Sequence, residues 1–163
     1  MSMIGYLMRV TQSELDEFLN DSSLLETKIE EVIDSDQIVD IDKSWDGIVY
    51  LLTGAGVATA EGPLLKVLFS GQLIDAEQDL GYGPAHYLTA SQVSLLSDEI
   101  SRISAEDLRL RFNAEEMNRL EVYPAIWDDD KDTFTYLADN FESVKAVYAD
   151  AAERGEAIIT FLS

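Results

Sequence analysis

Residues 134–162 constrain the fold more than any other part of this sequence. Aromatic and apolar side chains recur there at helical spacing over about five turns, namely Phe134, Leu137, Phe141, Val144, Tyr148 and Ala151. Gly155 follows at a position typical of a helix end. Residues 157–162 are then almost continuously apolar and partly β-branched, as in a strand buried on both faces. The pattern predicts a long helix that leads into a buried, central strand.

The N-terminal part of the sequence predicts a strand followed by two helices. Apolar residues alternate from Ile4 to Val10 with the period of a β-strand. Thr11 and Glu14 then form a capping box, and a second helical pattern runs over residues 22–33. We expect the two helices to bury one apolar face each, made of Leu15, Phe18, Leu19, Leu25, Ile29, Val32 and Ile33.

The middle of the sequence predicts shorter elements separated by turns, because apolar spacing there is interrupted by glycine, proline and capping residues. The expected elements are an extended piece at 38–42, helices over 44–54 and 63–71, a strand at 85–88, a helix after Thr89, two short helices after Ser104 and Asn113, and an extended connector at 122–127.

No internal repeat, low-complexity segment or linker divides the chain, so we expect one domain over residues 1–163. The predicted fold class is α+β, with several helices packed on a small mixed sheet. Both chain ends and a middle segment should supply the strands of that sheet.

The charge of the sequence narrows the range of partners. Asp and Glu number 32 against 11 Lys and Arg, which gives a formal net charge of −21. Nucleic acids and anionic membrane surfaces are bound through basic residues, so both are poor partners. A basic protein, a cation or a neutral small molecule remains as a ligand class. The alternative is that the charge only keeps a cytoplasmic protein soluble.

Apolar residues make up 47% of the sequence, which indicates a folded chain and not a disordered one. The start lacks the features of a signal peptide, and the longest apolar run, residues 48–52, is too short to cross a bilayer. We therefore expect a cytoplasmic protein. There is no cysteine, so disulfides and thiolate chemistry are excluded.

Signatures of known enzyme sites are missing from the sequence, and we expect no metal and no cofactor. There is no phosphate-binding loop, dinucleotide fingerprint, nucleophile elbow or zinc motif. Asp128, Asp130 and Asp132 have the spacing of a calcium loop, with Asp139 at its last position. The turn glycine is replaced by Thr133, so an acidic helix start is the better explanation.

Two segments mix polar and aromatic residues with glycine and are the candidate sites, residues 40–47 and 79–87. The candidate pocket or ligand-binding residues are Trp45, Asp46, Tyr50, Tyr82, His86 and Tyr123. The structural alternative for the first segment is that Asp46 stabilises its own helix and Trp45 fills the core. For the second it is a tight turn with a hydrogen-bonded or exposed His86.

Several motifs in a fixed order make the chain resemble the YfbM-like family of bacterial proteins, whose function is uncharacterised. They lie at residues 3–6, 42–47, 51–54, 63–71, 81–89 and 122–127, and the resemblance covers essentially the whole chain. The resemblance implies a compact α+β domain and carries over no catalytic residue.

Two functions are consistent with the sequence. The first is an acidic, non-enzymatic binding or interaction module, with contact patches at Glu14, Asp16, Glu17 and Asp21 or at Asp128, Asp129, Asp130 and Asp132. The second is a small-molecule-binding enzyme with a site near Asp46, Tyr82 and His86. In that case His86 would act as a general acid or base beside Asp46.

Overall fold

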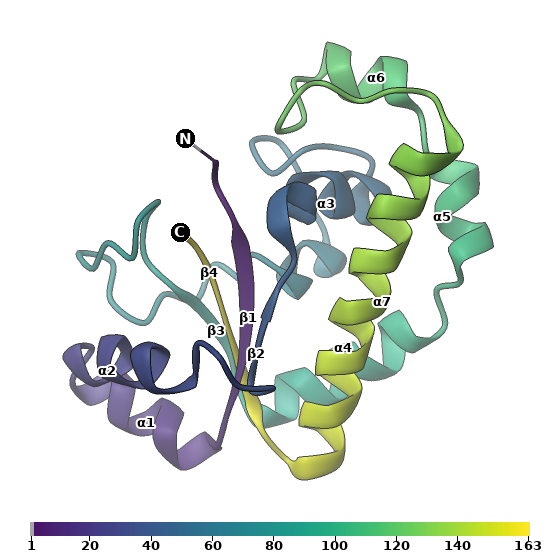
Figure 1. The fold of residues 1–163 in the computed structure, drawn as a ribbon. Coiled ribbons are helices and arrows are strands. Elements are labelled where there is room, and N and C mark those ends of the chain that lie inside the picture. The colour runs from purple at the N-terminus through teal and green to yellow at the C-terminus, as the bar shows by residue number, and fades with distance from the viewer. Residues whose placement is uncertain (1) are drawn as a thin grey trace.

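A four-stranded antiparallel sheet lies at the centre of the structure, a computed structural model in which residues 2–163 are described (Figure 1). The strands are β1 (Gly5–Val10), β2 (Ile38–Asp40), β3 (His86–Leu88) and β4 (Ala157–Leu162), in the order β2-β1-β4-β3. The two chain ends therefore form the central pair, which confirms the α+β class and the buried C-terminal strand. The expected mixed sheet is corrected, because all three strand pairings are antiparallel.

Helices surround the sheet in the order that the sequence predicts. The α-helices are α1 (Gln12–Asn20), α2 (Ser23–Val32), α3 (Trp45–Thr53), α4 (Ala90–Ser101), α5 (Ala105–Arg111), α6 (Ala114–Arg119) and α7 (Lys131–Arg154). Two short 3-10 helices, η1 (Asp42–Ser44) and η2 (Pro63–Val67), complete the set. The helix expected over residues 63–71 is thus shorter than predicted.

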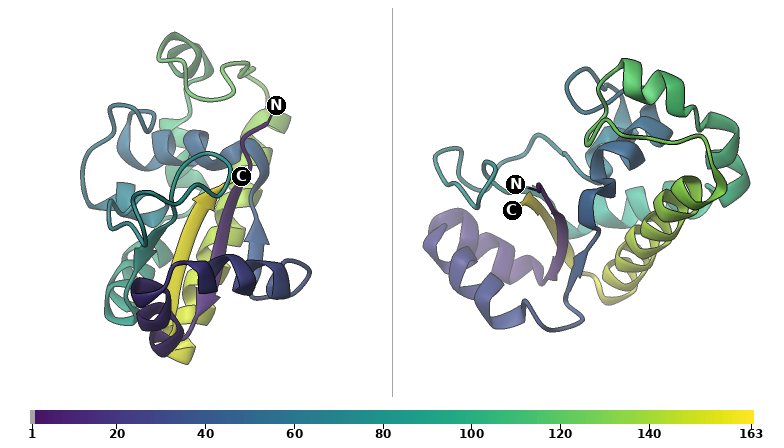
Figure 2. Two further views of the ribbon diagram at one scale, coloured as in Figure 1. Left: turned by 90° about the vertical axis from the view of Figure 1, so that its left-hand side faces the viewer. Right: turned by 45° about the horizontal axis from the view of Figure 1, so that its top comes forward.

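The sheet separates two apolar cores, and this explains why both faces of its central strands are apolar. On one face Tyr6, Met8 and Ile159 pack with α1 and α2. On the other, Leu7 and Ile158 pack with α3, α4 and α7. Figures 1 and 2 show the resulting three layers, with α1 and α2 on one side of the sheet and the remaining helices on the other.

Local signals at the helix ends are confirmed. Thr11 and Thr89 each close a capping box with the residue three positions later. Gly54 and Gly155 end α3 and α7 in the left-handed conformation that glycine adopts without steric cost. Asp130 accepts a hydrogen bond from the Thr133 amide and so caps α7, which starts before Phe134.

Two residues expected in the core are exposed. Leu19 is 42% exposed, because α1 buries only the narrow stripe of Leu15 and Phe18. Ile33 is 44% exposed, because it follows the last residue of α2 and lies at the edge of the layer.

One basic side chain is buried at the end of β1. The Arg9 guanidinium donates from one nitrogen to Glu156 Oε1 at 2.7 Å and from the other to the Asp36 carbonyl oxygen at 3.3 Å. The ion pair ties β1 to the residue that precedes β4.

Candidate functional site

Residues 42–47 form η1 and the first turn of α3, and their polar groups hold separate parts of the fold together. Asp42 Oδ2 accepts a hydrogen bond from the Tyr136 hydroxyl of α7 at 2.7 Å. The same hydroxyl accepts one from the Lys43 amide at 3.0 Å. Gly47 faces the Trp127 ring, at a position where a β-carbon would lie 2.9 Å from the ring. Residues 42–47 therefore hold α7 through the Tyr136 hydroxyl and pack against Trp127 at the end of the 122–127 loop.

Asp46 is buried and bridges two loops. Its Oδ1 accepts a hydrogen bond from the Val57 amide at 2.7 Å, and its Oδ2 accepts one from the Tyr123 amide at 2.8 Å. Burial raises the pKa of Asp46, and the two amide hydrogen bonds act in the lowering direction. Both carboxylate oxygens of Asp46 therefore bind backbone amides of residues that are distant from Asp46 in the sequence.

Four rings make a continuous row beside this carboxylate. Trp45 stacks on Tyr123 with ring centroids 5.1 Å apart and meets the edge of Phe69 at 5.8 Å. Phe69 in turn meets His86 at 5.5 Å. The row joins the predicted residues Trp45, His86 and Tyr123 through Phe69, which the sequence did not single out.

His86 is held by the backbone of a neighbouring loop. The Gly71 amide donates to His86 Nδ1 at 3.0 Å, which places the ring proton on Nε2. Burial lowers the pKa of His86. Between residues 2 and 163 no hydrogen bond joins His86 to Asp46.

The remaining two candidates lie apart from the row. Tyr50 is buried in α3, and its hydroxyl donates to Glu116 Oε1 at 2.6 Å. Tyr82 is 38% exposed in a turn in which Asp79 Oδ1 accepts from the amides of Gly81 and Gly83.

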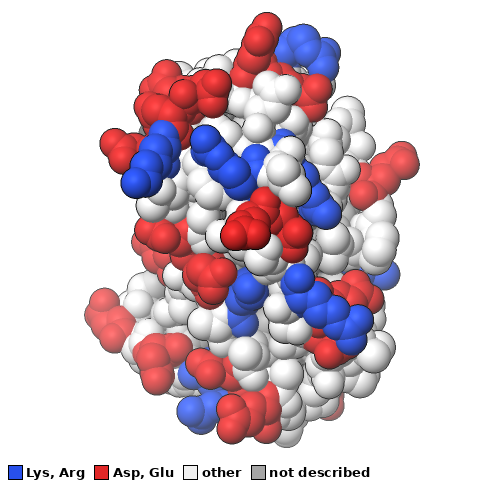
Figure 3. Space-filling model, turned by 90° about the vertical axis from the view of Figure 1, so that its right-hand side faces the viewer, with Lys and Arg blue, Asp and Glu red and all other residues white. Residues whose placement is uncertain are grey.

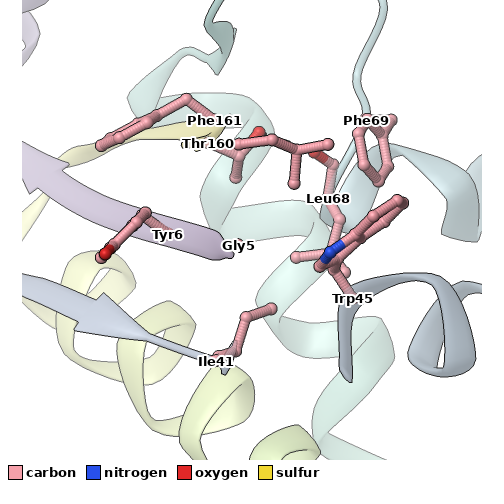
Figure 4. A pocket seen from close by; sticks show the side chains of 9 residues that line it. Gly5, Tyr6, Ile41, Trp45, Leu68, Phe69, Thr160 and Phe161 are labelled. Carbon is pink, nitrogen blue, oxygen red and sulfur yellow. Dashed lines mark hydrogen bonds between the residues drawn. The ribbon is translucent and has the colours of Figure 1, made fainter. Parts of the chain in front are cut away.

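Trp45 also lines a small cavity between α3 and the sheet (Figure 4). The cavity measures about 10 Å³ and is bounded by Gly5, Ile41, Phe69 and Thr160 among others. That volume accommodates one water molecule at most. Trp45 is buried and the other three rings of the row are half-buried, and the cavity beside Trp45 leaves no room for a substrate.

A larger open groove of about 370 Å³ lies beside the motif, between the 122–127 loop and the start of α7. The residues that line it are Asp42, Lys43, Pro124, Ile126, Trp127, Asp132, Thr133 and Tyr136. Ile126 is 76% exposed, so an apolar side chain stands in solvent at the edge of a concave surface.

The loop that carries Ile126 is fixed in place by hydrogen bonds at both ends. Asp46 holds Tyr123 at one end. At the other, the Asn118 side chain accepts from the Trp127 amide at 2.9 Å and donates to its carbonyl oxygen at 2.7 Å. The Trp127 indole also donates to the Val122 carbonyl oxygen at 2.9 Å. A loop anchored in this way loses little conformational entropy when a partner binds.

The groove has an acidic wall. The hydrogen bond from Tyr136 lowers the pKa of Asp42 and so keeps that carboxyl ionised. Asp132 lies on the α7 side, next to the exposed carboxylates of Asp128, Asp129 and Asp130. Lys43 is 3.5 Å from Asp42, and both side chains are more than one-third exposed, so the pairing is weak.

Part of this groove could be predicted from the sequence. It indicated residues 40–47 as a candidate site, and separately Asp128, Asp129, Asp130 and Asp132 as a possible contact patch. It did not single out Ile126 or Tyr136, because a lone apolar residue in a loop has no periodicity and Tyr136 lies within a regular helix.

The acid surplus is mostly unpaired. Within residues 2–163, seven of the 32 acidic side chains take part in ion pairs. Figure 3 shows acidic and basic side chains interleaved on the face that carries α5 and α7.

In the described part of the chain no three His, Asp or Glu side chains are grouped as a metal site requires. None of the helices formed by residues 2–163 combines the length and apolar character needed to span a bilayer.

Comparison with known proteins places the chain in a family. A family model described as a domain of unknown function, DUF1877, matches residues 1–161. The chain belongs to the DUF1877 family. Protein YfbM of Escherichia coli (strain K12) is 25% identical over 130 residues, which cover 77% of this chain and 75% of that protein. The resemblance inferred from the sequence motifs is therefore confirmed.

The same fold is found in a solved crystal structure. The crystal structure of YfbM from Escherichia coli, described as a protein of unknown function, matches with a TM-score of 0.81 at 18% identity. The match covers 98% of this chain and 99% of that chain. It shows that the present protein has the fold of YfbM and assigns no activity to it.

Proposed function

We propose that this protein is a non-enzymatic binding module that docks a basic segment of a partner protein in the groove beside Ile126. The observation that carries the proposal is the 76% exposure of Ile126 on a loop fixed at both ends. An apolar side chain displayed on a rigid support is typical of the centre of a protein interface.

The charge of the groove selects the class of partner. Asp42 and Asp132 line the groove, and three further carboxylates precede α7. A partner with an apolar side chain flanked by Lys or Arg would complement both the Ile126 surface and this acidic wall. The net charge of −21 would also speed the approach of such a partner.

The enzyme alternative gains no support from the positions of its residues. His86 and Asp46 would have to share a proton, yet each accepts hydrogen bonds from backbone amides. The binding-module hypothesis is therefore preferred.

We also infer a bacterial and cytoplasmic setting. The first rests on the Escherichia coli relative. The second rests on the strongly charged surface, which is suited to a crowded aqueous compartment.

Selection from a random peptide display library tests the proposal. We expect the selected peptides to carry an apolar residue flanked by Lys or Arg. Ile126→Ser should weaken binding of the selected peptides by about tenfold or more, because it removes the apolar contact.

Leu110→Ser is the matched control for that variant. Leu110 is 88% exposed on α5 and does not line the groove, so its loss should leave binding unchanged. Selected peptides without a basic bias, or equal binding to the Ile126→Ser variant and the native protein, would refute the proposal.

A further inference from the structure

A second pocket, of about 270 Å³, lies on the opposite side of the sheet between α2 and the loop around residue 80. In Figure 1 this is the side that carries α1 and α2. Its lining residues come from β1, from α2 and the residue after it, from the end of β4 and from the loop at residues 79–80. It is separate from the groove proposed for a protein partner and shares no lining residue with it.

The floor of this pocket is aromatic. Tyr6 of β1 and Phe161 of β4 are cross-strand partners, and their rings stack at 5.1 Å with an interplanar angle of 18°. Figure 4 shows both rings projecting to the same side of the sheet, away from Trp45. Ile29, Ile33 and Leu80 extend the apolar surface. Aromatic faces attract cations, and this floor also suits a methylene chain.

The rim of the pocket carries only negative charge. Glu26 and Glu30 lie one helical turn apart on α2, a spacing at which like charges repel. Asp79 lies across the pocket, and its Oδ1 is occupied by two loop amides. None of these three carboxylates is in an ion pair with any of residues 2–163, and no Lys or Arg lines the pocket.

We propose that this pocket binds a small aliphatic diamine, with one ammonium group at Glu26 and Glu30, the other at Asp79, and the methylene chain on the Tyr6 and Phe161 rings. The ammonium group at Glu26 and Glu30 would relieve the repulsion along α2, and the other would pair with the Asp79 carboxylate across the pocket. The apolar floor distinguishes this pocket from a general polyanionic surface, which would bind an amine without contact to its methylenes.

Calorimetric titration with putrescine, an aliphatic diamine, tests this proposal. Putrescine should bind with one-to-one stoichiometry, and Glu30→Gln should weaken its binding by about threefold to fivefold, the effect of one exposed ion pair. Glu31→Gln is the matched control, because it removes the same charge one position along α2 from a residue outside the pocket. Butanediol, which has the same chain without the charges, should not bind.

Three results would overturn the proposal. They are no one-to-one binding of putrescine up to about 10 mM, equal losses from Glu30→Gln and Glu31→Gln, and equal binding of butanediol. Tyr6→Phe keeps the ring and should keep the affinity, whereas Tyr6→Leu should lower it in a variant whose circular dichroism spectrum matches the native one. Ile126→Ser should leave putrescine binding unchanged, so failure here is distinguishable from failure of the protein-docking groove.

Discussion

Replacement of Asp46 by Asn tests the role of this carboxylate in supporting the groove. The native side chain accepts two backbone hydrogen bonds, from Val57 at 2.7 Å and from Tyr123 at 2.8 Å. Asn offers one acceptor oxygen and directs an NH₂ group at the second amide, so one hydrogen bond is lost and two donors face each other.

The expected loss of stability follows from these contacts. A hydrogen bond to a charged group contributes about 1.5–3 kcal/mol, and an unsatisfied buried donor adds a further cost. Part of the loss is offset, because burial raises the pKa of Asp46 and thus disfavours the native carboxylate. We expect Asp46→Asn to lower the free energy of unfolding by about 2 kcal/mol and Asp46→Ala, which removes both acceptors, by about 4 kcal/mol.

Urea unfolding followed by tryptophan fluorescence measures both changes. Trp45 stacks on Tyr123, and the second tryptophan, Trp127, ends the same loop, so the emission of the two tryptophans reports on this region. In a protein of this size the Asn variant should melt about 4–8 °C lower. If Asp46→Asn were as stable as the native protein, the carboxylate would not hold the two loops as an anion, and the argument for a pre-organised groove would fail.

Three further changes test other parts of the structure. Gly47→Ala would stabilise an open helix by about 1 kcal/mol; here its β-carbon would lie 2.6 Å from Leu137 and 2.9 Å from Trp127, so we expect a loss of about 1–3 kcal/mol in urea unfolding. Arg9→Ala leaves Glu156 without its buried partner and should cost about 3 kcal/mol, and a cost below 1 kcal/mol would contradict the assigned ion pair. His86 has a lowered pKa in the native state, so the unfolded chain binds the proton first and the native protein should lose stability as the pH falls below about 6.5. His86→Asn should lack this loss when urea midpoints are compared between about pH 7.5 and 5.5, and equal pH dependence in both proteins would refute it.

Much of the fold could be predicted because its signals are local. Capping boxes at Thr11 and Thr89 and glycines at 54 and 155 fix the helix ends within a few residues of chain. The apolar run at 157–162 indicated a central strand for the same reason. The order of the strands and their antiparallel directions were not predictable, because both depend on packing between segments that are distant in the sequence.

The groove was only partly predictable for the same physical reason. Asp46 stands in a recognisable motif, but its partners Val57 and Tyr123 are 11 and 77 positions away. Leu19 shows the opposite error, since its spacing fits a buried stripe but α1 buries only Leu15 and Phe18. Ile126 gives no signal at all in the sequence, because exposure of a loop residue is decided by tertiary structure.

Mapping of amide chemical shifts during titration with a selected basic peptide tests the central claim most directly. The account predicts shifts concentrated at residues 125–136 and at Asp42 and Lys43, with loss of these shifts in Ile126→Ser and retention in Leu110→Ser. Shifts spread over the acidic faces of α1 and α2, with no concentration at the groove, would contradict it.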